Sequence, residues 1–134
     1  MTTRVRVRYA ETDAQGVAYH SNYLIWFEVG RSEYFRQVVG DSPAEFFRRY
    51  GMPVVEARVR YRAPCRYDDE LVIFTQASQV RSRSIRFDYV ISLCDVPSTL
   101  VAEGHTVHLC VDSSGAPCRI PDEVRLPLVE RLPG

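Results

Sequence analysis

The sequence predicts an α+β fold in which a strongly curved antiparallel sheet of about five strands wraps around one long helix. Between residues 23 and 38, apolar side chains recur at three- and four-residue spacings, which predicts a helix with a broad buried face. After residue 52, polar and apolar residues alternate, which predicts a series of strands. One flat sheet face cannot cover a helix that is apolar around so much of its circumference, so we expect a curved sheet.

The first third of the chain predicts one strand and two helices. Residues 3–9 alternate polar and apolar and predict a strand with one exposed face. The long helix is expected from about residue 22 to residue 39, and Gly40 is placed to end it because glycine accepts the left-handed conformation. Residues 41–43, Asp-Ser-Pro, offer a cap and a first-turn proline for a short helix over residues 44–50.

The remaining chain predicts strands joined by polar turns. Four further strands are expected, over residues 53–63, 71–80, 85–93 and 99–112. The last of these strands carries small side chains at Ala102, Gly104 and Thr106, which would let a helix pack close to the sheet. A short C-terminal helix is expected over residues 126–132, with Pro121, Asp122 and Glu123 as its cap. The resulting sheet curved around one helix is the hotdog architecture.

Composition limits the class of protein. The 134 residues, with 46% apolar content, predict a single domain over residues 1–134. Seventeen basic and seventeen acidic side chains give zero net charge, which argues against a nucleic-acid binder. We expect no signal peptide and no membrane insertion, because no apolar run approaches about 18 residues. The four cysteines lack metal-binding spacing and are expected to be free thiols of a cytoplasmic protein, with no metal and no cofactor.

The loop before the long helix is the main candidate for chemistry. Asp13 lies in this loop, and Gly16 allows a bend within it. The free N–H groups at the start of a helix attract negative charge, whether from a side chain or from an oxyanion that forms during a reaction. A carboxylate there can act as a nucleophile or as a general base. On its local context alone, Asp13 fits a turn better than a catalytic role.

Residues 7–36, VRYAETDAQGVAYHSNYLIWFEVGRSEYFR, carry a recognisable pattern. The pattern D-x-x-G-V-x-Y-H-x-x-Y, followed by W-F-E-x-x-R, resembles the 4-hydroxybenzoyl-CoA thioesterase family of hotdog proteins. The Tol–Pal-associated branch of short acyl-CoA thioesterases is the nearest match in pattern. Residues 61–64, 102–104 and 120–121 agree as well, so the resemblance covers almost the whole chain.

The resemblance implies an acyl-CoA thioesterase with Asp13 as nucleophile or general base. It assigns the backbone N–H of His20 to polarising the thioester carbonyl, and the His20 side chain is a second catalytic candidate. The substrate-binding candidates at this loop and helix start are Gly16, Val17, Tyr19 and Tyr23. A non-catalytic module that binds acyl-CoA or acyl-carrier protein is the alternative function.

A second set of candidates lies outside this loop. In related thioesterases, basic residues near the corresponding hairpin meet the phosphates of coenzyme A, which implies this role for Arg81, Arg83 and Arg86. A solvated turn is the alternative. The resemblance also implies a homodimer or homotetramer, with residues 53–63 as an edge strand.

Four further side chains are expected to have ordinary structural roles. Glu28 and Arg31 lie one turn apart on the helix and are expected to pair with each other. His105 and His108 are expected to be ordinary strand residues that point to opposite faces of the sheet.

Overall fold

The computed structural model describes residues 1–40 and 43–133, so the cap predicted at Asp41 and Ser42 lies outside the described residues. The elements in chain order are β1 (Thr2–Arg6), a short 3-10 helix (Tyr9–Glu11), α1 (Asn22–Val39), α2 (Pro43–Phe47), β2 (Val54–Tyr61), β3 (Glu70–Val80), β4 (Ser84–Leu93), β5 (Leu100–Leu109) and α3 (Asp122–Glu130). No helix in these ranges is long and apolar enough to cross a membrane.

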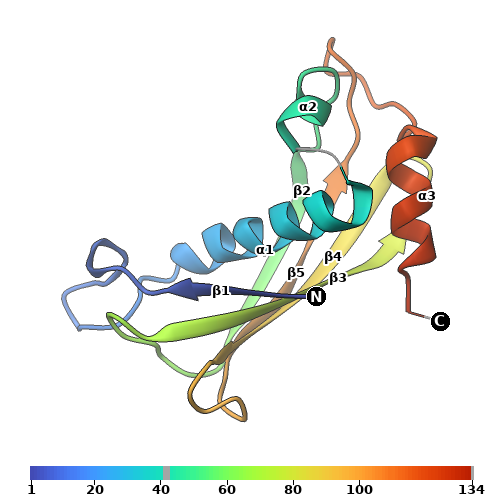
Figure 1. The fold of residues 1–134 in the computed structure, drawn as a ribbon. Coiled ribbons are helices and arrows are strands. Elements are labelled where there is room, and N and C mark those ends of the chain that lie inside the picture. Colours follow the sequence, from blue (N-terminus) through green and yellow to red (C-terminus); the bar gives the residue numbers. More distant parts are fainter. Residues whose placement is uncertain (41–42, 134) are drawn as a thin grey trace.

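The strands form one five-stranded sheet in the order β1-β3-β4-β5-β2. Every neighbouring pair is antiparallel. Figure 1 shows α1 lying across one face of this sheet, with α3 near the C-terminal end of α1. The predicted hotdog arrangement is confirmed, and so is the prediction that the strand before Pro64 lies at an edge of the sheet.

The core forms where α1 meets the sheet. The side chains that α1 buries follow the predicted spacing: Tyr23, Trp26, Phe27, Gly30, Tyr34 and Phe35. The ring of Phe27 stacks on that of Tyr89, with 4.2 Å between centroids. A Cβ at Gly104 would lie 3.0 Å from the Phe27 ring and would clash with the backbone of β2. The small residue in β5 therefore gives the helix its close approach, as predicted.

Several element boundaries differ from the predictions. β1 ends at Arg6 because the chain turns into the 3-10 helix at Tyr9, where the Arg8 N–H donates to the Glu11 carboxylate at 2.7 Å. α3 begins at Asp122, four residues before the predicted start at residue 126. α2 ends at Phe47 and β5 at Leu109, each three residues before its predicted end. Val55 in β2 is 58% exposed because β2 lies at the sheet edge.

Candidate active site

The loop before α1 is a tight hairpin. Thr12 and Ala18 form a bridge, and the Asp13 N–H donates to the Val17 carbonyl at 2.9 Å. The Gly16 N–H donates back to the Asp13 carbonyl at 3.0 Å, and Gly16 has a φ of 79°. That left-handed conformation is strained for residues with a Cβ, so the predicted role of Gly16 in the bend is confirmed.

The two oxygens of the Asp13 carboxylate differ in their hydrogen bonding. Oδ1 accepts the backbone N–H of Gln15 at 2.8 Å and that of Val17 at 3.4 Å. This is the side-chain turn that the local context predicted. Within the described ranges, Oδ2 has no hydrogen-bond partner and no ion pair. One oxygen of Asp13 therefore holds the loop, and the other is available to a ligand.

A buried carboxylate joins the loop to α1. Glu11 is 5% exposed, and its Oε2 accepts the Trp26 indole N–H at 3.2 Å. The Asn22 side chain donates to the Glu11 carbonyl at 2.8 Å. No sequence pattern indicated Glu11 as part of the site. The signal that could have found it is the buried Trp26, because a buried indole N–H needs an acceptor.

The start of α1 has an unused donor at the predicted position. The Tyr19 N–H donates to the Glu11 carbonyl at 2.8 Å, and the Asn22 N–H donates to the Tyr19 carbonyl at 3.1 Å. Between them, the His20 N–H has no acceptor in the part of the chain that the structure describes. The Ser21 side chain makes no capping hydrogen bond. The positive end of the helix dipole is therefore not neutralised locally at His20.

A hollow of about 280 Å³ lies between this helix start and the end of β2. Its lining residues are Ala18, His20, Tyr23, Tyr61, Arg62, Ala63 and Pro64. The rings of Tyr23 and Tyr61 meet edge to face at 5.0 Å, and the Tyr61 hydroxyl donates to the His20 carbonyl at 3.0 Å. Burial raises the pKa of Tyr23, so its hydroxyl stays protonated and Tyr23 serves as a wall of the hollow.

The structure brings only some of the loop candidates together. His20 and Tyr23 line the hollow, and the exposed Tyr19 ring packs on the His20 ring at 4.3 Å. Asp13 and Val17 lie on the adjoining loop and do not line the hollow. No hydrogen bond or ion pair in the described ranges links Asp13 to His20. Arg66, which no sequence pattern indicated, places its guanidinium next to Gly16.

The three arginines that were predicted to bind phosphate, Arg81, Arg83 and Arg86, do not all lie together in the structure. β3 begins beside the loop and runs for 11 residues, about 33 Å at the usual rise per residue, to the turn that carries Arg81 and Arg83. Both arginines are exposed and lie in this turn between β3 and β4. Arg86 points to the outer face of β4 instead and pairs with Asp88 at 3.1 Å. Within one chain, Arg81 and Arg83 are therefore remote from Asp13.

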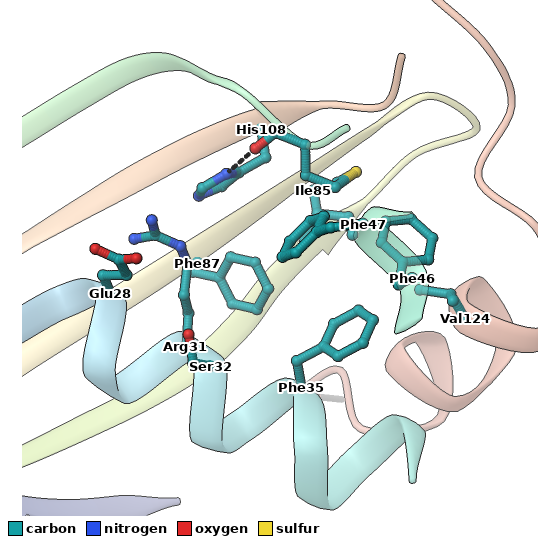
Figure 2. Close-up of a pocket in the computed structure, with 11 residues that line it drawn as sticks. Glu28, Arg31, Ser32, Phe35, Phe46, Phe47, Ile85, Phe87, His108 and Val124 are labelled. Atoms are coloured by element: carbon teal, nitrogen blue, oxygen red, sulfur yellow. Dashed lines mark hydrogen bonds between the residues drawn. The ribbon is translucent and has the colours of Figure 1, made fainter. Parts of the chain in front are cut away.

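A second pocket, of about 190 Å³, lies beside the C-terminal half of α1. Its lining residues are Glu28, Arg31, Ser32, Phe35, Phe46, Phe47, Met52, Ile85, Phe87, His108 and Val124. Figure 2 shows the phenylalanine rings around its apolar part and the polar ends of Glu28, Arg31 and His108 together at one side. The predicted pairing of Glu28 with Arg31 is not observed, since no ion pair joins them in the described ranges.

His108 has a defined tautomer. Its Nδ1 lies 3.0 Å from the Met52 carbonyl, which can only accept, so Nδ1 carries the proton. Its Nε2 must then accept from the Thr106 hydroxyl at 2.8 Å, and Thr106 in turn accepts from the Tyr89 hydroxyl at 2.7 Å. Burial lowers the pKa of His108 to about 4, which keeps the ring neutral. His105, by contrast, faces outward and lies 2.7 Å from Glu56.

The fold is that of the hotdog thioesterases. Residues 7–128 match the family model described as the Thioesterase-like superfamily, and the chain belongs to this family. It is accordingly a thioester hydrolase.

Named relatives agree with this assignment. The chain is similar to the acyl-CoA thioester hydrolase YbgC of Escherichia coli O157:H7, with 36% identity over 81% of this chain and 79% of the relative. It is 31% identical to a 1,4-dihydroxy-2-naphthoyl-CoA hydrolase of Synechococcus elongatus, over 94% of this chain and 87% of the relative. A solved structure of a hypothetical protein from Thermus thermophilus superimposes with a TM-score of 0.88 at 33% identity, over 97% of this chain and 98% of that one.

Proposed function

We propose that this protein hydrolyses an acyl-CoA to a carboxylic acid and coenzyme A. The observation that carries the proposal is the unused His20 N–H at the start of α1, beside a loop in which Asp13 keeps one free oxygen. The relatives described as acyl-CoA thioester hydrolases support the coenzyme A part of the substrate. The YbgC relatives are also consistent with the Tol–Pal-associated branch, which stays a prediction, as does a cytoplasmic location.

In this mechanism the thioester carbonyl accepts the His20 N–H, and the helix dipole stabilises the oxyanion as it forms. Asp13 then acts in one of two ways. Its free oxygen either attacks the carbonyl carbon to give a mixed anhydride or removes a proton from the attacking water. In both routes the carbon–sulfur bond breaks, the CoA thiolate leaves, and water supplies the second carboxylate oxygen of the product. In this proposal the His20 side chain orients the thioester.

A substrate panel tests the proposal. Purified protein is incubated with acetyl-, butyryl-, hexanoyl-, benzoyl- and 4-hydroxybenzoyl-CoA, and free CoA is followed with a thiol reagent. An enzyme releases many equivalents of CoA for each chain. The alternative, a module that only binds acyl-CoA or acyl-carrier protein, is supported instead if every acyl-CoA raises the melting temperature while none is hydrolysed.

We also propose that the active unit is a homodimer or a homotetramer of such dimers. β2 pairs with β5 on one side only, so its other edge has unpaired backbone groups. Val54, Val55 and Tyr61 on this strand are all at least 46% exposed. A two-fold axis perpendicular to the sheet would pair β2 with a second β2 in antiparallel orientation and would cover these side chains.

Light scattering tests this assembly. We expect the wild-type protein to have at least twice the 15.4 kDa mass of one chain. Val55→Asp places a charge on the proposed interface and should give a monomer that has lost most of its activity. Val96→Asp, at an exposed loop position away from β2, should keep both the assembly and the activity. A wild-type monomer with full activity would contradict the proposal.

Arg81 and Arg83 have a testable role in such an assembly. Both lie about 33 Å along the sheet from the Asp13 loop of their own chain, so they can meet coenzyme A phosphates only at the site of another chain. We expect Arg81→Gln with Arg83→Gln to raise KM for acyl-CoA about tenfold and to leave kcat nearly unchanged, because the phosphates are remote from the reacting carbonyl. Kinetics with acyl-pantetheine, which lacks the nucleotide, are the control. Equal losses with both substrates would assign these arginines to structure.

A further inference from the structure

Two cysteines face each other beside the pocket that contains His108. The Sγ atoms of Cys110 and Cys118 lie 3.4 Å apart, and both residues are free thiols. Cys65 instead has its Sγ 3.5 Å from the Tyr23 hydroxyl, and Cys94 lies in a separate turn between β4 and β5. We propose that Cys110 and Cys118 are an oxidation site that forms a reversible intramolecular disulfide.

The backbone already has the geometry that this bond requires. Val111 and Pro117 form an antiparallel bridge, and the Cys118 N–H donates to the Cys110 carbonyl at 2.9 Å. In this register Cys110 lies directly opposite Cys118, so both side chains point to the same face. The reciprocal hydrogen bond is absent, because the Cys110 N–H donates to the Arg83 carbonyl at 2.8 Å. Directly opposite residues of an antiparallel pair have Cα atoms about 4.5–5.5 Å apart, inside the range of about 4.4–6.8 Å that disulfides use. The bond therefore needs rotation of the side chains and little movement of the backbone.

The two thiols differ in their access to an oxidant. Cys118 is half-buried and Cys110 is fully buried. Burial raises the pKa of the Cys110 thiol to about 12, and the hydrogen bond and charge of Cys118 add to this effect. Cys118 is therefore the thiol that reacts first with a dissolved disulfide.

Oxidised glutathione is a sufficient oxidant. The Cys118 thiolate attacks one of its sulfur atoms, forms a mixed disulfide and releases one glutathione thiolate. The Cys110 thiolate then attacks the Cys118 sulfur and displaces the second glutathione thiolate. The two cysteines lose two protons and two electrons, and one oxidised glutathione becomes two reduced molecules. The mixed disulfide also removes the Cys118 charge that opposes ionisation of Cys110.

The hairpin is connected to the wall of the pocket. The N–H of Val111 donates to the Gly51 carbonyl at 2.9 Å, and the N–H of Gly51 donates to the Val111 carbonyl at 2.8 Å. The next residue, Met52, has the carbonyl that holds His108 Nδ1. A disulfide at the base of the hairpin therefore restricts the segment that fixes the polar side of the pocket, and it should raise the melting temperature by several degrees.

Peptide mapping tests the proposal. The protein is treated with oxidised glutathione, remaining thiols are alkylated, and the chain is cleaved before aspartates. Residues 95–111 and 112–121 are then separate peptides with one cysteine each. We expect them to stay joined, with a mass two hydrogens below their sum, and to separate after dithiothreitol. The melting temperature should rise on oxidation and fall back on reduction.

Matched variants complete the experiment. Cys118→Ala keeps the buried Cys110 and should lose both the joined peptides and the rise in melting temperature. Cys94→Ser should behave as the wild-type protein does. The proposal is wrong if glutathione stays attached to Cys118 without joining the peptides, or if the pair stays reduced while Cys94 is modified. Neither outcome depends on hydrolysis of acyl-CoA, so the proposed function and this site fail separately.

Discussion

Asp13→Asn is expected to lower kcat at least a thousandfold, which corresponds to about 4 kcal/mol of transition-state stabilisation. An asparagine side chain keeps an oxygen acceptor for the N–H groups of Gln15 and Val17, so the loop should retain its shape. The amide neither attacks a carbonyl well nor takes a proton from water. The measurement is free CoA released per chain, with circular dichroism and acyl-CoA binding as checks on the fold.

Asp13→Ala and His20→Ala are the matched variants. Asp13→Ala loses both the turn acceptor and the proposed chemistry, so it should be no more active than Asp13→Asn and less stable. His20→Ala keeps the backbone N–H and should cost much less in kcat. If Asp13→Asn retains more than a tenth of the wild-type kcat while Asp13→Ala does not, Asp13 serves the turn and not the reaction.

The largest expected loss of stability follows from Gly30→Val. A Cβ at this position would clash with Thr75 Oγ1 and lie 2.9 Å from the Ile73 side chain, so α1 would have to move away from β3. We expect the free energy of unfolding to fall by about 3 kcal/mol or more, from overpacking and from the β-branched side chain in a helix. Urea denaturation measures this change.

Gln37→Val is the control for Gly30→Val. It introduces the same residue at an exposed position of the same helix and should change the free energy of unfolding by less than about 0.5 kcal/mol. Similar losses in the two variants would mean that valine weakens the helix itself. A stable Gly30→Val protein would mean that α1 is not held close to β3 at this position.

Local sequence patterns were sufficient to predict most of the helices and strands. The three- and four-residue spacing of apolar side chains predicted α1 within a residue at each end. Gly40 ends that helix with a φ of 87°, and its N–H donates to the Arg36 carbonyl at 3.1 Å. The position of Asp13 in a turn that contains Gly16 was also readable. These features depend on residues within a few positions of one another, and such spacings are visible in a sequence.

The residues that form the candidate site were harder to predict from the sequence. The resemblance assigned His20 and Tyr23 to the site, and both line the hollow. It also included Tyr61 at the end of β2, but it did not assign Tyr61 to the site. From the sequence, Glu11 looks like a polar loop residue, but in the structure it is buried against Trp26. The two thiols of the proposed oxidation site are eight residues apart and look unrelated until the hairpin between them is formed.

By itself, the sequence determined which segments are helical and extended, the fold class, and the loop that carries Asp13, because hydrophobic periodicity and turn chemistry act over short distances. Only the tertiary structure decided that Glu11 is buried against Trp26 and that His108 joins a buried hydrogen-bond chain from Tyr89 to the Met52 carbonyl. It also decided that Arg81 and Arg83 lie far from Asp13 in the same chain. Strand order and burial depend on which distant segments pair. The free energy of that pairing comes from contacts throughout the assembled core, so no local stretch of the sequence reveals it.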